Sequence, residues 1–405
     1  MAVMKKIDGG VCAATGFTAG GIRCGIRPNQ TKKDLALIFS EVPCQAAGVF
    51  TKNRVKADPV QLDQENLRDG IAQAVIANSG IANACAPHGR QAAVRMGQIA
   101  AERLGIPAEN VMVCSTGIIG QDLDTDVIAS QIGTLVLRRD GALEAEEAIM
   151  TTDTRPKMTA YSFTAGGKTC RIGGICKGAG MIHPNMGTML CFITTDCAVS
   201  SAMIRKALQE DVRVTFNRVS VDGDTSTNDT CLVLANGLAG NAVITEEDAD
   251  YAAFRDALRQ VMQDLAVMVA ADGEGATRLL TVHVQGAKDE ETAEKLASAV
   301  CQSTLTKAAM FGADANWGRV LCACGYSGAE FDPQKADIAF RSAAGEIAVC
   351  AHGQGLAFDE DLARKILSQD AVVIEIRLPD GGGDVCCWGC DLTYDYVKIN
   401  GEYRS

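Results

Sequence analysis

The stretch Lys177-Gly-Ala-Gly-Met-Ile-His-Pro-Asn-Met-Gly-Thr-Met-Leu190 places three glycines and a proline before a single hydroxyl residue, Thr188. Glycine and proline interrupt regular backbone, while the run that follows, Met189-Leu-Cys-Phe-Ile193, is typical of a buried strand. Thr188 is therefore expected at a loop-to-strand junction, directly after Gly187. We interpret this junction as a self-cleavage site, at which the Gly187–Thr188 bond is cut and Thr188 becomes an N-terminal nucleophile.

An N-terminal threonine carries its own base, because its α-amine has an ordinary pKa of ~8 and can accept the hydroxyl proton. Cleavage would proceed by attack of the Thr188 hydroxyl on the Gly187 carbonyl, through an ester that water resolves. The glycine eases this close approach. The chain has only four histidines, and none lies in a context that favours a Ser-His-Asp triad. Cys176 and Cys191 flank the stretch as rival nucleophiles, but neither has a partner base nearby in sequence.

The composition of the 405 residues, 47% hydrophobic and 22% charged, is that of a soluble globular protein. No apolar run approaches the ~18 residues that a membrane span needs. The first ten residues hold no apolar segment of a secretory signal, so we expect a cytoplasmic protein without a membrane partner. The net charge of −12 argues against a nucleic-acid partner, since phosphate binding needs a basic face.

The charge is divided unevenly at Thr188. Residues 1–187 hold 20 Lys and Arg against 17 Asp and Glu, a charge of +3, whereas residues 188–405 hold 18 against 33, a charge of −15. Two fragments of opposite charge would remain associated, although chance variation in surface charge explains the numbers equally well. No linker interrupts the sequence, so we divide the chain into residues 1–187 and 188–405.

The 17 cysteines are an odd number and lie scattered through apolar runs, which is typical of small buried side chains in a reducing compartment. Cys387 and Cys390 have the spacing of a zinc pair, and Cys322 and Cys324 form a second cluster. No histidine lies close in sequence to either cluster. We therefore predict no metal site.

Short apolar strands alternate with amphipathic helices, which indicates an α/β or α+β fold. Strands are predicted at residues 74–77, 111–114, 279–284 and 372–376. Helices are predicted at residues 91–104, 290–300 and 359–367, and a further one from Thr245, with Asp248 as a variant cap.

Three polar loops are candidate sites. Ser115-Thr116-Gly117 follows a predicted strand, where backbone N–H groups and hydroxyls build oxyanion holes; an ordinary turn explains it better from the residues alone. Residues 151–157, Thr-Thr-Asp-Thr-Arg-Pro-Lys, suit a helix cap or an anion site, with a solvated turn as the simplest interpretation. Residues 220–229 resemble a calcium loop, but Thr227 and Val233 stand where that loop needs glycine and glutamate.

The residues around Thr188 resemble the self-cleavage motif of the ornithine acetyltransferase (glutamate N-acetyltransferase) family. The resemblance runs along essentially the whole chain, in a series of motifs in the same order: Lys33-Asp-Leu-Ala-Leu37, Ala47-Gly-Val-Phe-Thr51, Asn78-Ser-Gly80, Ser115-Thr-Gly117, Thr151-Thr-Asp-Thr154, residues 220–230, Asn316-Trp-Gly-Arg319 and residues 391–400.

This resemblance implies a layered α/β sandwich like that of N-terminal-nucleophile hydrolases, with different strand connections. It implies self-cleavage before Thr188, an α2β2 assembly of the two fragments, and no cofactor. The reaction implied is acetyl transfer from N-acetylornithine to glutamate in arginine biosynthesis, with acetyl-CoA as an additional co-substrate left open. The implied roles are a nucleophile at Thr188, an oxyanion hole at Thr116 and Gly117, and substrate contacts at Thr151, Lys177, Thr188, Glu274, Asn400 and Ser405.

These roles are chemically consistent. Both amino acids carry an α-carboxylate, which suits Lys177, and the cationic end of ornithine suits Glu274. The chain departs from the family pattern at Gly187, where alanine is usual, and at Ile81, Ala315 and Ser405. Two alternatives remain open: a related amide hydrolase or aminopeptidase with the same nucleophile, and an uncleaved amino-acid-binding paralogue.

Overall fold

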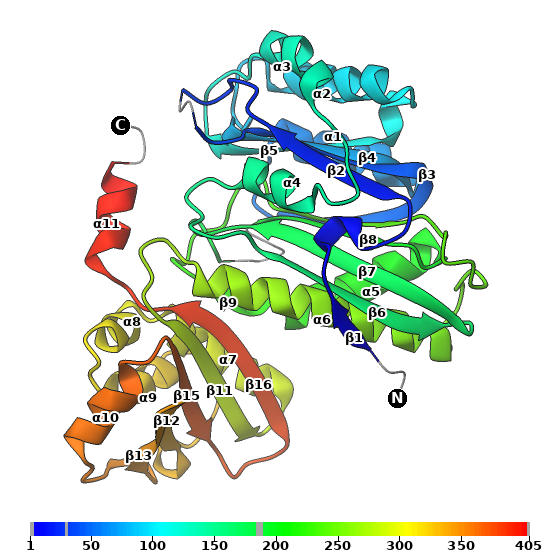
Figure 1. Ribbon diagram of the computed structural model, residues 1–405. Coiled ribbons are helices and arrows are strands. Elements are labelled where there is room, and N and C mark those ends of the chain that lie inside the picture. The colour runs from blue at the N-terminus through cyan, green and yellow to red at the C-terminus, as the bar shows by residue number, and fades with distance from the viewer. Residues whose placement is uncertain (1–3, 29–30, 184–188, 403–405) are drawn as a thin grey trace. The chain divides into compact units, whose positions relative to one another are not determined.

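A computed structural model describes residues 4–28, 31–183 and 189–402 (Figure 1). These residues form two compact units, each of which is described by itself. The first unit comprises residues 4–28, 31–178, 189–217 and 224–266, and the second comprises residues 179–183, 218–223 and 267–402.

The first unit is built on a nine-stranded mixed sheet. Its strands are β1 (Lys5–Ile7), β2 (Phe17–Ile22), β3 (Leu35–Phe50), β4 (Ile71–Ile81), β5 (Val111–Ile118), β6 (Met158–Ala165), β7 (Lys168–Lys177), β8 (Leu190–Thr195) and β10 (Thr230–Ala235). The hydrogen-bonded order is β1-β6-β7-β8-β10-β3-β4-β5, with β2 added on β3. The β8/β10 and β4/β5 pairs are parallel, and the others are antiparallel.

The sheet folds over its long strand β3 into two layers. Residues 45–50 of β3 pair with β10, while residues 35–39 and 44–45 pair with β4. One core cluster joins side chains of β7, β8 and β10 to those of β4 and β5, so the two halves pack face to face. The helices of this unit are α1 (Asp58–Asn66), α2 (Gly89–Leu104), α3 (Thr125–Gln131), α4 (Ala142–Ile149), α5 (Ser201–Val214) and α6 (Ala249–Ala271), of which residues 267–271 fall in the second unit.

Helices cover the outer faces of both layers. Side chains of α2 share a second core cluster with β3, β4 and β5, and α6 lies along β7, where a Cβ on Gly174 would lie 3.1 Å from Leu265 Cδ1 (Figure 1). Side chains of β5 alternate between the two clusters. Val111 and Val113 belong to the cluster that β5 shares with α2, and Met112 belongs to the cluster between the two layers of the sheet. Burial on both faces explains the unbroken apolar runs of these strands. The predicted layered α/β class is confirmed.

The second unit has a seven-stranded sheet of order β14-β13-β12-β15-β11-β16-β9. Four of its helices, at residues 290–302, 304–311, 317–325 and 360–367, pack on one face, where alternate residues of one strand (Leu280, Val282 and Val284) enter the core. The strands are β9 (Val219–Ser220), β11 (Leu279–Ala287), β12 (Asp337–Ser342), β13 (Gly345–Ala351), β14 (Gln354–Gly355), β15 (Ala371–Arg377) and β16 (Gly383–Cys390). The helices are α7 (Glu290–Gln302), α8 (Thr304–Phe311), α9 (Trp317–Gly325), α10 (Glu360–Leu367) and α11 (Tyr394–Gly401).

The predicted strands and helices are all present, with boundaries that differ from the expected ones by up to four residues. The helix expected from Thr245 begins at Ala249, because Asp248 itself caps it by accepting a hydrogen bond from the Tyr251 N–H at 2.8 Å. All 17 cysteines lie in the described residues as free thiols, and 13 of them are buried, as expected of small apolar side chains.

Candidate active site

The stretch from Lys177 to Leu190 connects two neighbouring antiparallel strands, β7 and β8. Lys177 ends β7, and its register partner is Leu190, the first residue of β8. The Lys177 side chain is mostly buried, and its Nζ lies 3.5 Å from the Thr116 Oγ1. The folding of the sheet over β3 makes this contact possible, because β8, β10, β3 and β4 separate β7 from β5 in the hydrogen-bonded order. Two predicted site residues are thus in contact.

Thr116 and Gly117 belong to a strand and not to the ordinary turn that the residues alone favour. Strand β5 continues to Ile118, and Gly117 pairs with Gly80 of β4. Gly117 has a φ of 132°, and a Cβ at this position would lie 2.2 Å from the Gly80 carbonyl carbon. Only glycine fits this backbone. The turn interpretation is therefore wrong.

Polar side chains fix the ends of β4 and β5. The Ser115 Oγ donates to Asn78 Oδ1 at 2.6 Å, and Asn78 Nδ2 donates to the Ile81 carbonyl at 2.9 Å. From the third polar loop, Asn228 Nδ2 donates to the carbonyls of Ala82 and Ser115 at 2.6 and 2.8 Å. These bonds hold the backbone next to Thr116 in one position.

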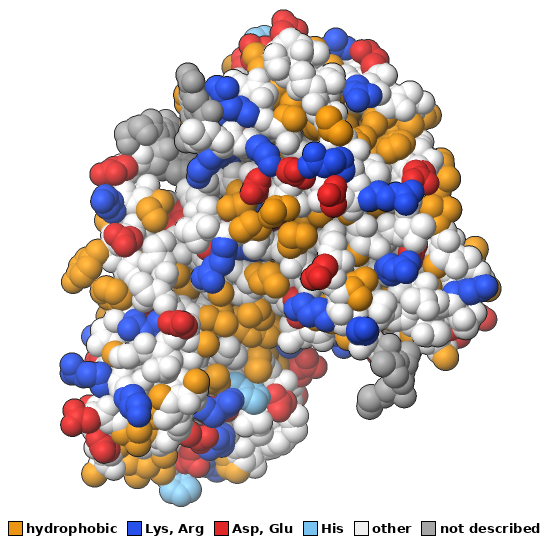
Figure 2. Space-filling model, in the orientation of Figure 1, with side chains coloured by type: hydrophobic (Ala, Val, Ile, Leu, Met, Phe, Trp, Pro, Cys, Tyr) orange, Lys and Arg blue, Asp and Glu red, His pale blue; other side chains and the backbone are white. Residues whose placement is uncertain are grey.

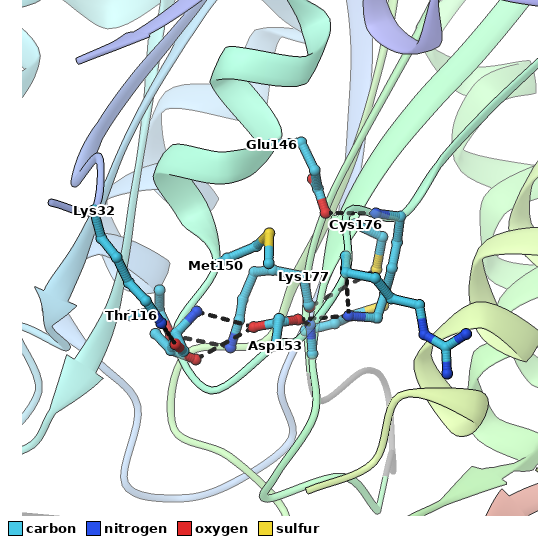
Figure 3. A network of polar contacts seen from close by, with 12 residues as sticks. Lys32, Thr116, Glu146, Met150, Asp153, Cys176 and Lys177 are labelled. Atoms are coloured by element: carbon cyan, nitrogen blue, oxygen red, sulfur yellow. Dashed lines mark hydrogen bonds and ion pairs between the residues drawn. The ribbon is translucent and has the colours of Figure 1, made fainter. Parts of the chain in front are cut away.

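The loop at residues 151–157 is an ordered part of this site (Figure 3). Asp153 and Lys157 are buried, and Lys157 Nζ donates to Asp153 Oδ1 at 2.7 Å. The same oxygen accepts the Gly178 N–H at 2.7 Å, while Asp153 Oδ2 accepts the Thr151 N–H at 2.9 Å. The interpretation as a solvated turn is wrong, because a buried ion pair organises the loop.

The carboxyl groups of this region differ in the direction of their pKa shifts. Burial alone would raise the pKa of Asp153, but Lys177 and Lys157 together lower it below its usual range. Burial raises the pKa of Glu146 well above its usual value, although its Oε1 accepts the Lys157 N–H at 3.0 Å. Burial also raises the pKa of Asp229, in spite of Lys177 nearby. Asp153 is therefore the ionised partner of the two lysines.

A second group of predicted residues lies in the second unit. Asn400 Nδ2 donates to Glu274 Oε2 at 2.7 Å, and Glu274 is 6% exposed. The Glu274 N–H donates to the Ala179 carbonyl at 2.9 Å, and a Cβ on Gly180 would lie 2.3 Å from the Glu274 Cδ. The missing side chain of Gly180 thus leaves room for this carboxylate.

Asp222 holds the segment that follows Gly180. Its Oδ2 accepts the Met181 N–H at 2.6 Å, and its Oδ1 accepts the Ile182 N–H at 2.9 Å. Met181 has a φ of 56°, an uncommon value for a residue with a side chain. The predicted residues Gly187, Thr188 and Ser405 lie outside the described residues.

The sequence did not reveal Asp153, Glu146, Asp222 and Asp229 as parts of these groups. Asp153 stands in a segment that resembles a solvated turn, and Asp222 and Asp229 stand in the stretch that resembles a calcium loop. Glu146 gives no signal, since it resembles its exposed neighbours on α4.

Over the described residues, no group of three or more His, Cys, Asp or Glu side chains is arranged to hold a metal ion. No helix within these residues is long and apolar enough to cross a membrane. On the face in Figure 2, Lys and Arg side chains alternate with Asp and Glu and form no continuous basic surface.

The sequence matches the model of the ArgJ family over residues 18–405. Among known proteins, the arginine biosynthesis bifunctional protein ArgJ of Symbiobacterium thermophilum is 51% identical over 406 residues, which cover 99% of this chain and 100% of that protein.

Two solved structures are also similar. The arginine biosynthesis bifunctional protein argJ from Bacillus halodurans is 44% identical, with 51% of this chain and 96% of that chain covered and a TM-score of 0.49. The ornithine acetyltransferase from Mycobacterium tuberculosis, complexed with ornithine, is 38% identical, with 45% and 99% covered and a TM-score of 0.42.

Proposed function

Because the chain belongs to the ArgJ family, we propose that it is an acetyltransferase of arginine biosynthesis that moves the acetyl group of N-acetylornithine to glutamate. The acetyl group passes first to the Thr188 hydroxyl, which releases ornithine, and then to the glutamate amine, which gives N-acetylglutamate. The contact between Lys177 and Thr116 carries this proposal. It places an ammonium group that can bind an anion, at the end of β7, next to a hydroxyl group on β5.

Lys177 and Thr151 bind the α-carboxylate that both substrates share. A charge-assisted hydrogen bond to an ammonium is roughly twice as strong as a neutral one. Lys177 is largely buried, so water competes weakly for this position.

Thr116 and Gly117 stabilise the oxyanion that forms when the acetyl carbonyl is attacked. One such donor is worth about 3 kcal/mol of barrier lowering when the site is preorganised. The fixed backbone around Ser115 and the Gly-only conformation of Gly117 support this role.

Glu274 binds the cationic end of ornithine. Asn400 occupies one carboxylate oxygen, Oε2, and orients the group. Ser405 is the remaining proposed contact. Glutamate lacks this cation, so Glu274 serves the first half-reaction more than the second.

Self-cleavage of the Gly187–Thr188 bond gives fragments 1–187 and 188–405, which form an α2β2 assembly. Antiparallel pairing of β7 with β8, from Ile172↔Thr195 to Lys177↔Leu190, supports their association after the cut. The proposed compartment is the cytoplasm, and acetyl-CoA is a proposed second acetyl donor, in keeping with the bifunctional name of the relatives.

The proposal is tested by incubating the purified protein with N-acetylornithine and glutamate and following both products by mass spectrometry. Equal amounts of ornithine and N-acetylglutamate are expected, and a parallel reaction with acetyl-CoA tests the second donor. Release of free acetate without N-acetylglutamate would identify an amide hydrolase. An intact chain that forms neither product would identify an amino-acid-binding paralogue.

A further inference from the structure

Asp153 connects two residues that we assign to substrate binding. Its Oδ2 accepts the Thr151 N–H at 2.9 Å and lies 3.5 Å from the Thr151 Oγ1. Its Oδ1 accepts the N–H of Gly178, the residue directly after Lys177, at 2.7 Å. One buried carboxylate therefore fixes the backbone at both positions.

The charges around Asp153 leave one lysine in excess. Lys157 and Lys177 both face the carboxylate, but only Lys157 makes the close ion pair, at 2.7 Å. Lys177 points instead to the Thr116 hydroxyl, 3.5 Å away (Figure 3). Two further buried acids lie near these lysines, and burial raises the pKa of both Glu146 and Asp229 well above the usual values. Of these three acids only Asp153 has a lowered pKa, and it faces two ammonium groups, of which Lys177 is the one that lies beside the Thr116 hydroxyl.

We propose that Asp153 is a positioning residue, which neutralises Lys157, leaves the charge of Lys177 available to the α-carboxylate of the amino-acid substrate, and aligns Thr151 beside it. This inference rests on the proposed function and names the residue that arranges its carboxylate site.

Glu146 supplies a reserve of negative charge to the same cluster. Its Oε1 accepts the Lys157 N–H at 3.0 Å, while its buried Oε2 has no hydrogen-bond partner among the described residues. Burial raises the pKa of Glu146, and its side chain is close in shape to that of glutamine, so Glu146→Gln has a smaller effect than Asp153→Asn. If Asp153 loses its charge, Glu146 can ionise and compensate in part.

The test is a double-mutant cycle of Asp153→Asn and Glu146→Gln, measured on protein whose processing has been verified by mass. Asp153→Asn is expected to raise the KM of N-acetylornithine and of glutamate about tenfold, because both carry the α-carboxylate, with a smaller change in kcat. Glu146→Gln is expected to raise both KM values much less than Asp153→Asn does. The double variant is expected to lose about tenfold more than the two single changes predict together.

Two further variants separate positioning from folding. Asp211→Asn is the matched control, since Asp211 is also buried between two cations, Arg255 and Arg259, at 3.5 and 2.8 Å. It is expected to leave both KM values unchanged. Asp153→Glu keeps the charge but moves it by one methylene, and is expected to raise both KM values even if Asp153→Asn does not fold.

A wild-type KM in Asp153→Glu, or strictly additive effects in the cycle, would overturn the inference. Wild-type protein without acetyl transfer would instead contradict the proposed function, so the two failures are distinguishable.

Discussion

Gly180→Ala tests whether Glu274 recognises the amine of ornithine. The new Cβ would lie 2.3 Å from the Glu274 Cδ and 2.4 Å from both carboxylate oxygens. Ordinary contacts begin near 3.4 Å, so the carboxyl group must retreat by about 1 Å. Such a shift moves the carboxylate away from the position in which Asn400 Nδ2 holds its Oε2 at 2.7 Å.

The magnitude follows from the bond that the substrate would lose. A hydrogen bond to a charged group is worth about 1.5–3 kcal/mol, so kcat/KM for N-acetylornithine should fall roughly 10- to 150-fold. The second half-reaction, from acetylated protein to glutamate, should change much less, because glutamate carries no side-chain amine.

The assay measures the two half-reactions separately by rapid quench on fully processed protein. Gly382→Ala is the control, since a Cβ there meets nothing within 4 Å. An equal loss in both half-reactions would refute the assignment of Glu274 to the ornithine amine, as would an unchanged first half-reaction.

Three other substitutions test the first unit. Lys177→Met should raise the KM of both substrates about 10- to 100-fold, because a charged hydrogen bond is lost. Lys168→Met, at the exposed end of the same strand, should leave both KM values unchanged. Steady-state kinetics measure both variants. Thr116→Val should lower kcat about 10²- to 10³-fold with little change in folding. Thr164→Val, at an exposed position, is the control. An unchanged kcat would contradict the assignment of Thr116 to the oxyanion hole. Burial raises the pKa of Asp63 well above its usual value, so its contribution to stability is complete below about pH 4 and is lost as the pH rises toward that raised pKa. Asp63→Asn should therefore gain in Tm over wild type as the pH rises above about 4, and a pH-independent difference would contradict the raised pKa of Asp63.

The sequence predicts the ends of helices and strands well where neighbouring residues alone determine them. The helix expected at residues 91–104 ends at Leu104, and Gly105 caps it with a φ of 68°, because only local backbone chemistry is involved. The helix expected from Thr245 shows where this prediction fails, because it begins at Ala249. Thr245 and Asp248 are both plausible caps, and the hydrogen bond that Asp248 accepts selects the later start.

The predicted site was incomplete for a different reason. Asp153 and Lys157 form a buried ion pair in a segment whose composition resembles a solvated turn. Their burial depends on the folding of the sheet over β3, which no local pattern encodes. The contact between Lys177 and Thr116 likewise joins strands that are remote in the hydrogen-bonded order. Motif resemblance indicated these residues, but it did not show which carboxylate arranges them.

The division of the chain at Thr188 stays a prediction that concerns cleavage and not folding. The first unit contains β7 from one proposed fragment and β8 from the other. A cut between paired strands leaves their hydrogen bonds in place, so the fragments would separate only on unfolding.

The most direct test of the central claim is intact-mass and peptide analysis of protein incubated with N-acetylornithine in the absence of glutamate. We expect fragments that end at Gly187 and begin at Thr188, with one acetyl group on Thr188 that disappears when glutamate is added. An uncleaved chain that still transfers acetyl groups, or an acetyl group on any other residue, would contradict the account.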